Sequence, residues 1–85
     1  MTLEELIGRF GEPRRSSALP VSQRLHGPQR ALLSLFPPDQ PGNQNLVLKD
    51  VRWVQGDYIL AVWLQDKDGA WVAVDACRWH KHLRF

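Results

Sequence analysis

The side chains best able to do chemistry lie together near the C-terminal end of the chain. Cys77, His80 and His82 offer a thiol and two imidazoles in a short stretch, and both groups are zinc ligands. On an extended strand the two histidines point to one side and the cysteine to the other, so joint ligation needs a bulge or a turn. A fourth ligand, His26, would have to come from far along the chain. We therefore expect a solvated strand end here, with no metal and no cofactor.

The same segment has the side chains of a nucleic-acid contact, because cations alternate with an aromatic ring that can stack on a base. The residues of this hypothesis are Arg78, Trp79, His80, Lys81, His82 and Arg84. The alternative is a charged edge strand that prevents edge-to-edge aggregation. A net charge of +2 permits nucleic-acid binding without requiring it, since nine acidic residues are interspersed with eleven basic ones.

No other motif in the sequence predicts catalysis. The run from Asp66 to Gly69 begins like a calcium loop but lacks the glutamate that would complete one, so we interpret it as a hairpin turn. Asp50, Asp57 and Asp75 show no pairing that would mark an acid–base couple, and phosphate-binding and nucleophile motifs are missing. Asp75 lies inside an apolar strand and is expected to pair with Lys49 or a nearby arginine. We expect a protein that is not an enzyme.

The sequence predicts one domain that spans residues 1–85 and lies in the cytoplasm. A chain of 85 residues has room for one core, and 44% apolar with 24% charged residues is typical of a globular protein. The N-terminus has neither a basic region nor a long apolar stretch, so no signal peptide and no membrane contact are expected. The single Cys77 also favours a reducing compartment.

The first 36 residues predict a helical and irregular half. Thr2 and Glu5 form a capping box at the start of a helix, and Gly11 with Pro13 ends it. This helix has an apolar stripe of Leu3, Leu6, Ile7 and Phe10. Residues 14–26 are expected to be irregular, with a short extended piece around 19–21. A second helix should begin at Gly27-Pro28 and end before Pro37, with one face made of Ala31, Leu32, Leu35 and Phe36.

The second half predicts strands. Residues 37–45 lack large apolar side chains and should form an exposed loop, after which the pattern is typical of a β-meander over 46–85. Two-residue and four-residue turns are expected at 55–56 and 66–69. The predicted fold class is α+β, with one or two short helices packed on a three- to four-stranded antiparallel β-meander.

Pairing Val54 with Asp57, and Gln65 with Ala70, makes both faces of this sheet apolar. Trp53 and Cys77 then lie on one face, and Trp63 and Ala76 on the other. If both helices cover one face, the other is left for a partner, and its interface residues would be Trp63, Ile59, Ala61, Val72 and Val74. The leading hypothesis is a protein-binding or adaptor domain that binds a partner protein or itself as a homodimer. The alternatives are that the helices divide, one to each face, or that the sheet curls into a barrel.

Overall fold

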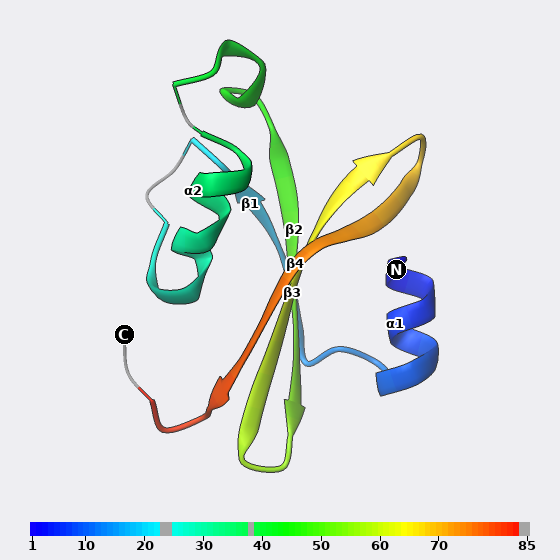
Figure 1. Cartoon of the computed structure of the whole chain (residues 1–85). Helices are drawn as coiled ribbons and strands as arrows, with labels where there is room; N and C mark the ends of the chain where they lie inside the picture. Colours follow the sequence, from blue (N-terminus) through cyan, green and yellow to red (C-terminus); the bar gives the residue numbers. More distant parts are fainter. Residues whose placement is uncertain (23–24, 38, 84–85) are drawn as a thin grey trace.

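Four strands form one antiparallel sheet in the order β1-β2-β3-β4 (Figure 1), which confirms the predicted α+β class. The computed structural model describes residues 1–22, 25–37 and 39–83. The elements are, in chain order, α1 Leu3–Phe10, β1 Arg15–Pro20, η1 Gly27–Ala31, α2 Leu32–Leu35, η2 Pro41–Asn43, β2 Val47–Gln55, β3 Tyr58–Lys67 and β4 Ala70–His80. Among the described residues, no helix is long and apolar enough to cross a membrane.

Helix α1 forms where the capping pattern predicts it. The Thr2 hydroxyl accepts from Glu5 N at 3.2 Å, and the Glu5 carboxylate accepts from Thr2 N at 3.1 Å, so two backbone donors at the helix start are satisfied. At the other end, Gly11 takes a φ of 84° while its N–H donates to Ile7 O. A positive φ is accessible to glycine at low cost, which explains why the helix ends there.

Strand β1 occupies a segment that the sequence led us to expect as irregular. It pairs with β2 from Arg15 opposite Arg52 to Pro20 opposite Val47. Only Leu19 within β1 is buried, so the alternation that identifies a strand is almost absent from its sequence. Pairing with β2 therefore decides its conformation, and Pro20 is tolerated because β1 is an edge strand.

Both β-hairpins turn later than the sequence suggests, yet the faces of β2 and β3 are as predicted. Gln55 pairs with Tyr58, and Lys67 with Ala70, so each turn has two residues. Each of these pairings differs from the predicted one by a register shift of two. An even shift leaves every side chain on the same face of the sheet, whereas an odd one reverses it.

An odd shift does occur within β4. A bulge between Trp63 and Leu64 leaves Val74 as an extra residue, and beyond it Ala61 pairs with Cys77 and Val62 with Ala76. Cys77 therefore joins the Trp63 face, and Ala76 moves to the other one. The predicted faces of these two residues were wrong, because a bulge of one residue has no signal in the sequence pattern.

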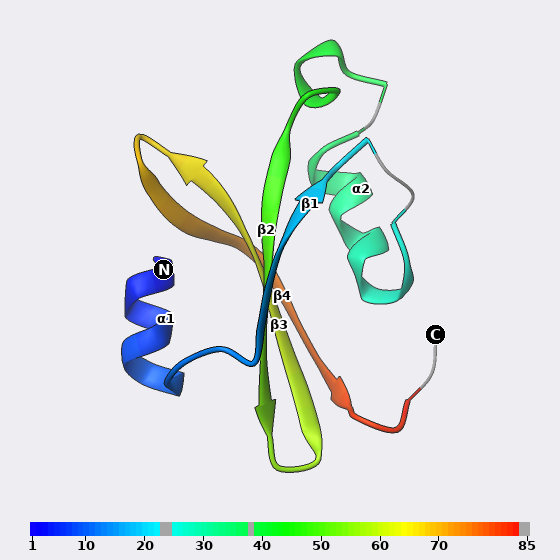
Figure 2. The ribbon, with the colours of Figure 1, turned by 180° about the vertical axis from the view of Figure 1, so that it is seen from behind.

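The helices divide between the two faces of the sheet (Figures 1 and 2). On one face, Leu6 of α1 packs with Trp53 and Leu64. On the other, Leu32 of α2 packs with Trp63, which is 1% exposed. The expectation that Trp63 lies bare is wrong, because η1 and α2 cover it, and the alternative of one helical segment on each face is confirmed.

The second helical segment begins at Gly27-Pro28 as predicted, with its first turn in the tighter 3-10 form. Helix α2 continues from it and ends when Phe36 N donates to Leu32 O at 2.8 Å. Leu32 is fully buried, whereas Leu35, predicted on the same face, is 51% exposed. The change from 3-10 to α geometry rotates the apolar stripe, so Leu32 is the main anchor of this segment.

This anchor leads to a stability prediction. We expect Leu32→Ala to lower the free energy of unfolding by about 2–5 kcal/mol, because it removes a buried side chain and leaves a cavity. Leu35→Ala, the control in the same helix, should change it by less than about 0.5 kcal/mol. Urea denaturation followed by tryptophan fluorescence measures both. Equal effects of the two substitutions would mean that α2 does not cover the Trp63 face.

Candidate functional site

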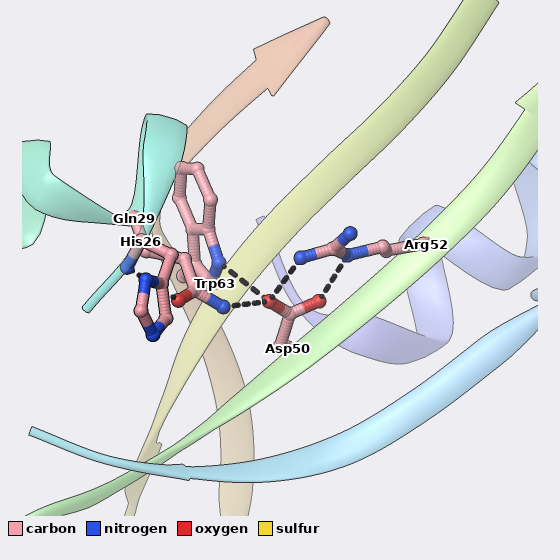
Figure 3. A network of polar contacts seen from close by, with 5 residues as sticks. All are labelled: His26, Gln29, Asp50, Arg52 and Trp63. Carbon is pink, nitrogen blue, oxygen red and sulfur yellow. Dashed lines mark hydrogen bonds and ion pairs between the residues drawn. The ribbon is translucent and has the colours of Figure 1, made fainter. Parts of the chain in front are cut away.

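The most extensive polar cluster in the described chain surrounds Asp50 (Figure 3). Asp50 lies on the Trp63 face of β2 and is 2% exposed. Its Oδ1 accepts from Arg52 Nε at 2.9 Å. Its Oδ2 accepts from Gln29 Nε2 at 2.9 Å, from Trp63 Nε1 at 3.0 Å and from Arg52 Nη2 at 3.2 Å. One carboxylate thus joins two strands of the sheet to η1, and we call this group of contacts the Asp50 cluster.

Gln29 is the link between η1 and the sheet. Its amide nitrogen donates to Asp50, while its Oε1 accepts from His26 N at 3.3 Å. Gln29 N in turn donates to His26 O, which closes the first turn of η1 (Figure 3). The entry of this helical segment is therefore held in place by a buried charge on β2.

The electrostatics of the Asp50 cluster indicate a structural role. Burial by itself would raise the pKa of Asp50, but hydrogen bonds from Arg52, Gln29 and Trp63, together with the positive charge of Arg52, outweigh it and lower the pKa. Asp50 is almost fully buried and its carboxylate accepts four hydrogen bonds, so a substrate cannot reach it to give up a proton. We assign no chemistry to Asp50 beyond holding η1 on the sheet.

The spacing of Asp50 and Arg52 in the sequence is a partial signal for this cluster, and the register of β2 and β3 supplies the rest. At strand spacing Asp50 and Arg52 point to the same face of β2, and the register places Asp50 opposite Trp63. An acid on a largely apolar sheet face needs donors when it is buried. An arginine two residues away and a tryptophan indole across the strand are such donors.

The five predicted interface residues do not form an open surface. Trp63 and Ala61 are buried beneath η1 and α2, at 1% and 0% exposure. Ile59, Val72 and Val74 are half-buried, and Val74 packs against the cluster that contains Trp63. A partner therefore has no access to the centre of this face in the folded chain.

The β2–β3 hairpin extends beyond both helices, as Figures 1 and 2 show. On the Trp63 face, Val54, Ile59 and Trp79 lie side by side across three strands, and Val54 is 48% exposed. The opposite face carries Tyr58, which is 43% exposed, with Arg78 and His80 beside it. We call these six residues the open end of the sheet.

The residues of the nucleic-acid hypothesis are distributed over both faces of the open end. The Arg78 guanidinium lies 4.8 Å from the centre of the Tyr58 ring, and the His80 ring is 5.5 Å from it. Trp79 lies on the other face, where Arg52 covers its ring at 5.4 Å. A base that stacks on Trp79 would thus be separated by the sheet from Arg78.

The remaining residues of that hypothesis lie past the end of β4. Lys81 forms an ion pair with Asp57 at 3.4 Å, and the His82 ring lies 5.2 Å from that of His80. Arg84 lies outside the described residues.

The structure keeps the candidate zinc ligands apart. Cys77 lies on the Trp63 face, while His80 lies on the other face, next to His82. Within residues 1–22, 25–37 and 39–83, no group of three or more histidine, cysteine or acidic side chains is placed to hold a metal ion.

The run from Asp66 to Gly69, which begins like a calcium loop, forms a hairpin turn as the sequence predicts. Asp66 Oδ1 accepts from Gly69 N at 3.0 Å within this turn.

Beyond Ala73, the outer side of β4 has no neighbouring strand among the described residues. At Val72 and Ala73 the N-terminus lies beside it, because Thr2 pairs with Val72 and Ala73 N donates to Met1 O at 2.8 Å. The Val74 bulge follows, and then comes the segment from Asp75 to His80, which pairs with β3 without a further register shift. We call the outer side of this segment the β4 edge.

The direction of the backbone groups along the β4 edge follows from one hydrogen bond. Lys81 N donates to Asp57 O at 2.8 Å, which makes Tyr58 and His80 a non-hydrogen-bonded pair. Alternation along the strand then turns the N–H and C=O groups of Ala76, Arg78 and His80 away from β3.

Asp75 supports this assignment, because its Oδ1 accepts from Ala76 N at 2.8 Å. The Ala76 N–H therefore points away from β3. The expected pairing of Asp75 with Lys49 does not form, and the Lys49 ammonium lies instead 4.6 Å from the centre of the Trp71 ring. An acid of this edge strand is thus used to satisfy a backbone donor of the same edge.

A hollow of about 240 Å³ lies between the start of α1 and the β3–β4 turn. Its walls are Thr2, Leu3, Glu4, Gly69, Ala70 and Trp71. Glu4 is the one titratable side chain among them, so no acid–base pair is present in this hollow and we build no reaction on it.

Comparisons with models of protein families, with curated proteins and with solved structures found no match to this chain. The functional assignment therefore depends on the geometry of the open end and of the β4 edge.

The Asp50 cluster predicts how stability depends on pH. Because the pKa of Asp50 is lower in the folded than in the unfolded chain, its contribution is present above the unfolded pKa and is lost as pH falls through the folded pKa. We expect Asp50→Asn to cost about 1.5–3 kcal/mol at pH 7 and to flatten the decline of the free energy of unfolding below about pH 4.

Urea denaturation between pH 7 and pH 2 measures this effect. Asp39→Asn, which removes an exposed carboxylate from the loop after α2, serves as the control and should keep the slope of the wild-type protein. An Asp50→Asn profile with an unchanged slope would show that Asp50 does not ionise against its donors in the folded state.

Proposed function

We propose that this chain is a non-enzymatic protein-binding domain that takes an extended segment of a partner protein onto the β4 edge. The observation that carries the proposal is the row of backbone groups of Ala76, Arg78 and His80, which point away from β3 with no strand beside them in the described chain. Such a row is a template for adding a strand, and several peptide-binding domains use strand addition.

The hydrogen-bonding capacity of this edge is partly used within the chain. The His80 carbonyl accepts from Leu83 N at 2.9 Å, and the Ala76 N–H donates to Asp75. An added strand would pair with both backbone groups of Arg78 and with the Ala76 carbonyl, and would displace the Asp75 carboxylate from the Ala76 N–H. Arg78 is therefore the centre of the proposed site.

The β4 edge suits strand addition better than the other edge of the sheet does. Strand β1 has six residues and ends in Pro20, which has no N–H to donate. Strand β4 has eleven residues, and its first part already pairs with Thr2 of the same chain. This short pairing supports the view that an extended segment fits beside β4.

The open end provides side-chain contacts next to these backbone groups. Trp79 is the outermost member of the apolar row that continues through Ile59 to Val54, and all three are at least partly exposed. A strand added to β4 would place its own side chains beside this row. The expected function thus remains protein binding, with its location moved from the covered Trp63 face to the β4 edge.

Peptide display with a blocked variant tests this proposal. Immobilised protein should select peptides from a random twelve-residue library, and these peptides should slow amide hydrogen exchange at Arg78 and His80. Ala76→Pro removes an N–H that β3 does not use, and should weaken the selected peptides by about tenfold or more, since it deletes one hydrogen bond and blocks close approach.

The matched control is Ala18→Pro on the β1 edge. Val21 N donates to Leu46 O at 3.1 Å, so alternation along β1 turns the Ala18 N–H away from β2 as well. This variant should bind the selected peptides like the wild type. Peptides that protect another part of the chain, or that bind the Ala76→Pro variant equally well, would overturn the proposal.

The oligomeric state of the pure protein is measured alongside by sedimentation equilibrium. We expect a monomer, because antiparallel pairing of two β4 edges centred on Arg78 would place this arginine opposite the same arginine of the second copy, and like charges repel. A dimer that Ala76→Pro dissociates would make a second copy of this chain the occupant of the edge, and would overturn the proposal of a separate partner.

A further inference from the structure

The two faces along the β4 edge differ in charge, and the difference bears on the partner that the proposed function requires. Ala76, Arg78 and His80 point to the face that carries Tyr58, whereas Cys77 and Trp79 point to the Trp63 face. In a strand added to this edge, side chains would alternate between the same two faces. Each face of the edge would therefore contact every second side chain of the partner strand.

On the Tyr58 face the edge is basic. The Arg78 guanidinium lies against the Tyr58 ring, and the described part of the chain provides it with no carboxylate. Two neighbouring cations do have carboxylate partners, because Arg52 is paired with Asp50 and Lys81 with Asp57.

Imidazoles extend this basic face. The rings of His80 and His82 lie 5.2 Å apart, and His80 contacts Tyr58. Imidazoles add positive charge when they are protonated. The acid nearest to Arg78 along the strand is Asp75, which lies on the opposite face and is bonded to Ala76 N. Within residues 1–22, 25–37 and 39–83, no acidic side chain on the Tyr58 face of the edge forms an ion pair with Arg78.

On the Trp63 face the edge is apolar from Cys77 to Trp79. Both side chains are half-buried, and both pack against the core cluster under η1 and α2. Asp75 adds a negative charge at the start of this segment, which would repel an acidic residue on the same face. The residues of an added strand beside Cys77 and Trp79 should therefore be apolar.

We infer that the partner of the β4 edge is an extended segment in which acidic and apolar side chains alternate. Its acidic residues lie on the Tyr58 face beside Arg78 and His80, and its apolar residues lie on the Trp63 face beside Cys77 and Trp79. This inference rests on the proposed strand addition and specifies the chemistry of the partner. It follows from the charge that Arg78 presents and from the alternation that the β4 register imposes.

The same cations would attract a nucleic acid, but the rest of the edge favours a peptide. The backbone donors and acceptors of Arg78 match those of another strand, and a phosphate backbone cannot reproduce that pattern. Two of the five arginine and lysine side chains described at this end are already paired with acids: Arg52 with Asp50, and Lys81 with Asp57, whereas Arg14, Arg15 and Arg78 have no such pair. Arg14 precedes β1 and Arg15 begins it, at the far edge of the sheet, so a nucleic acid at β4 would have few phosphate contacts.

Two capped hexapeptides labelled with fluorescein test the inference. One alternates glutamate and valine, and the other alternates lysine and valine, so they share strand propensity and differ in charge. By fluorescence anisotropy at low salt, we expect the glutamate peptide to bind the wild-type protein on the order of tenfold more tightly, because opposite charges across paired strands attract and like charges repel.

The decisive variant is Arg78→Glu, which should reverse the preference so that the lysine peptide binds more tightly. Arg30→Glu is the control, because it makes the same change in net charge at an exposed residue of η1. It should leave the preference for the glutamate peptide intact. If both charge reversals act alike, the preference comes from net charge and the inference is overturned.

The remaining outcomes separate this inference from the proposed function. Equal binding of both peptides, weakened in both cases by Ala76→Pro, would overturn the acidic preference and leave strand addition standing. If neither hexapeptide binds, while peptides selected by display still protect the Arg78 amide from exchange, the acidic preference is likewise overturned and strand addition still stands. A ten-residue oligothymidylate that binds more tightly than the glutamate peptide, and whose binding Ala76→Pro does not change, would overturn both.

Discussion

A sheet that is apolar on both faces has to be covered twice, and this constraint determines how the short chain is arranged. Helix α1 covers the face of Trp53, and η1 with α2 covers the face of Trp63. Each cover is small, since Leu6 is the buried residue of α1 and Leu32 that of α2. The Asp50 cluster adds polar contacts where apolar area is scarce, because it binds η1 to the sheet through Gln29.

The same cluster connects the core to the proposed binding edge. Arg52 donates to Asp50 with its Nε and Nη2 atoms, and its guanidinium also lies over the Trp79 ring at 5.4 Å. A guanidinium that is held by a buried carboxylate is a rigid support for an aromatic ring. The position of Trp79 at the open end thus depends on an ion pair that also secures η1.

The helices that cover the centre of both faces do not extend over the β2–β3 hairpin or along the outer side of β4 (Figure 1). The N-terminus closes part of that side at Val72, and the Val74 bulge separates this part from the rest. Asp75 then satisfies the Ala76 N–H, which limits uncontrolled pairing of the edge. The proposed site for an added strand and protection against aggregation are therefore combined within one segment of β4.

The sequence by itself determined α1, the second helical segment, the three longer strands and the faces of most of their side chains, because capping and periodicity are local properties. Strand β1 required the tertiary structure, since its conformation comes from pairing with β2. So did the faces of Ala76 and Cys77, because a one-residue bulge reverses them without changing the residue pattern. The location of the candidate site was also decided in three dimensions. The sequence makes both Trp63 and Arg78 candidates for a binding surface. Only the tertiary structure shows that η1 and α2 cover Trp63, whereas Arg78, on the other face, stays exposed.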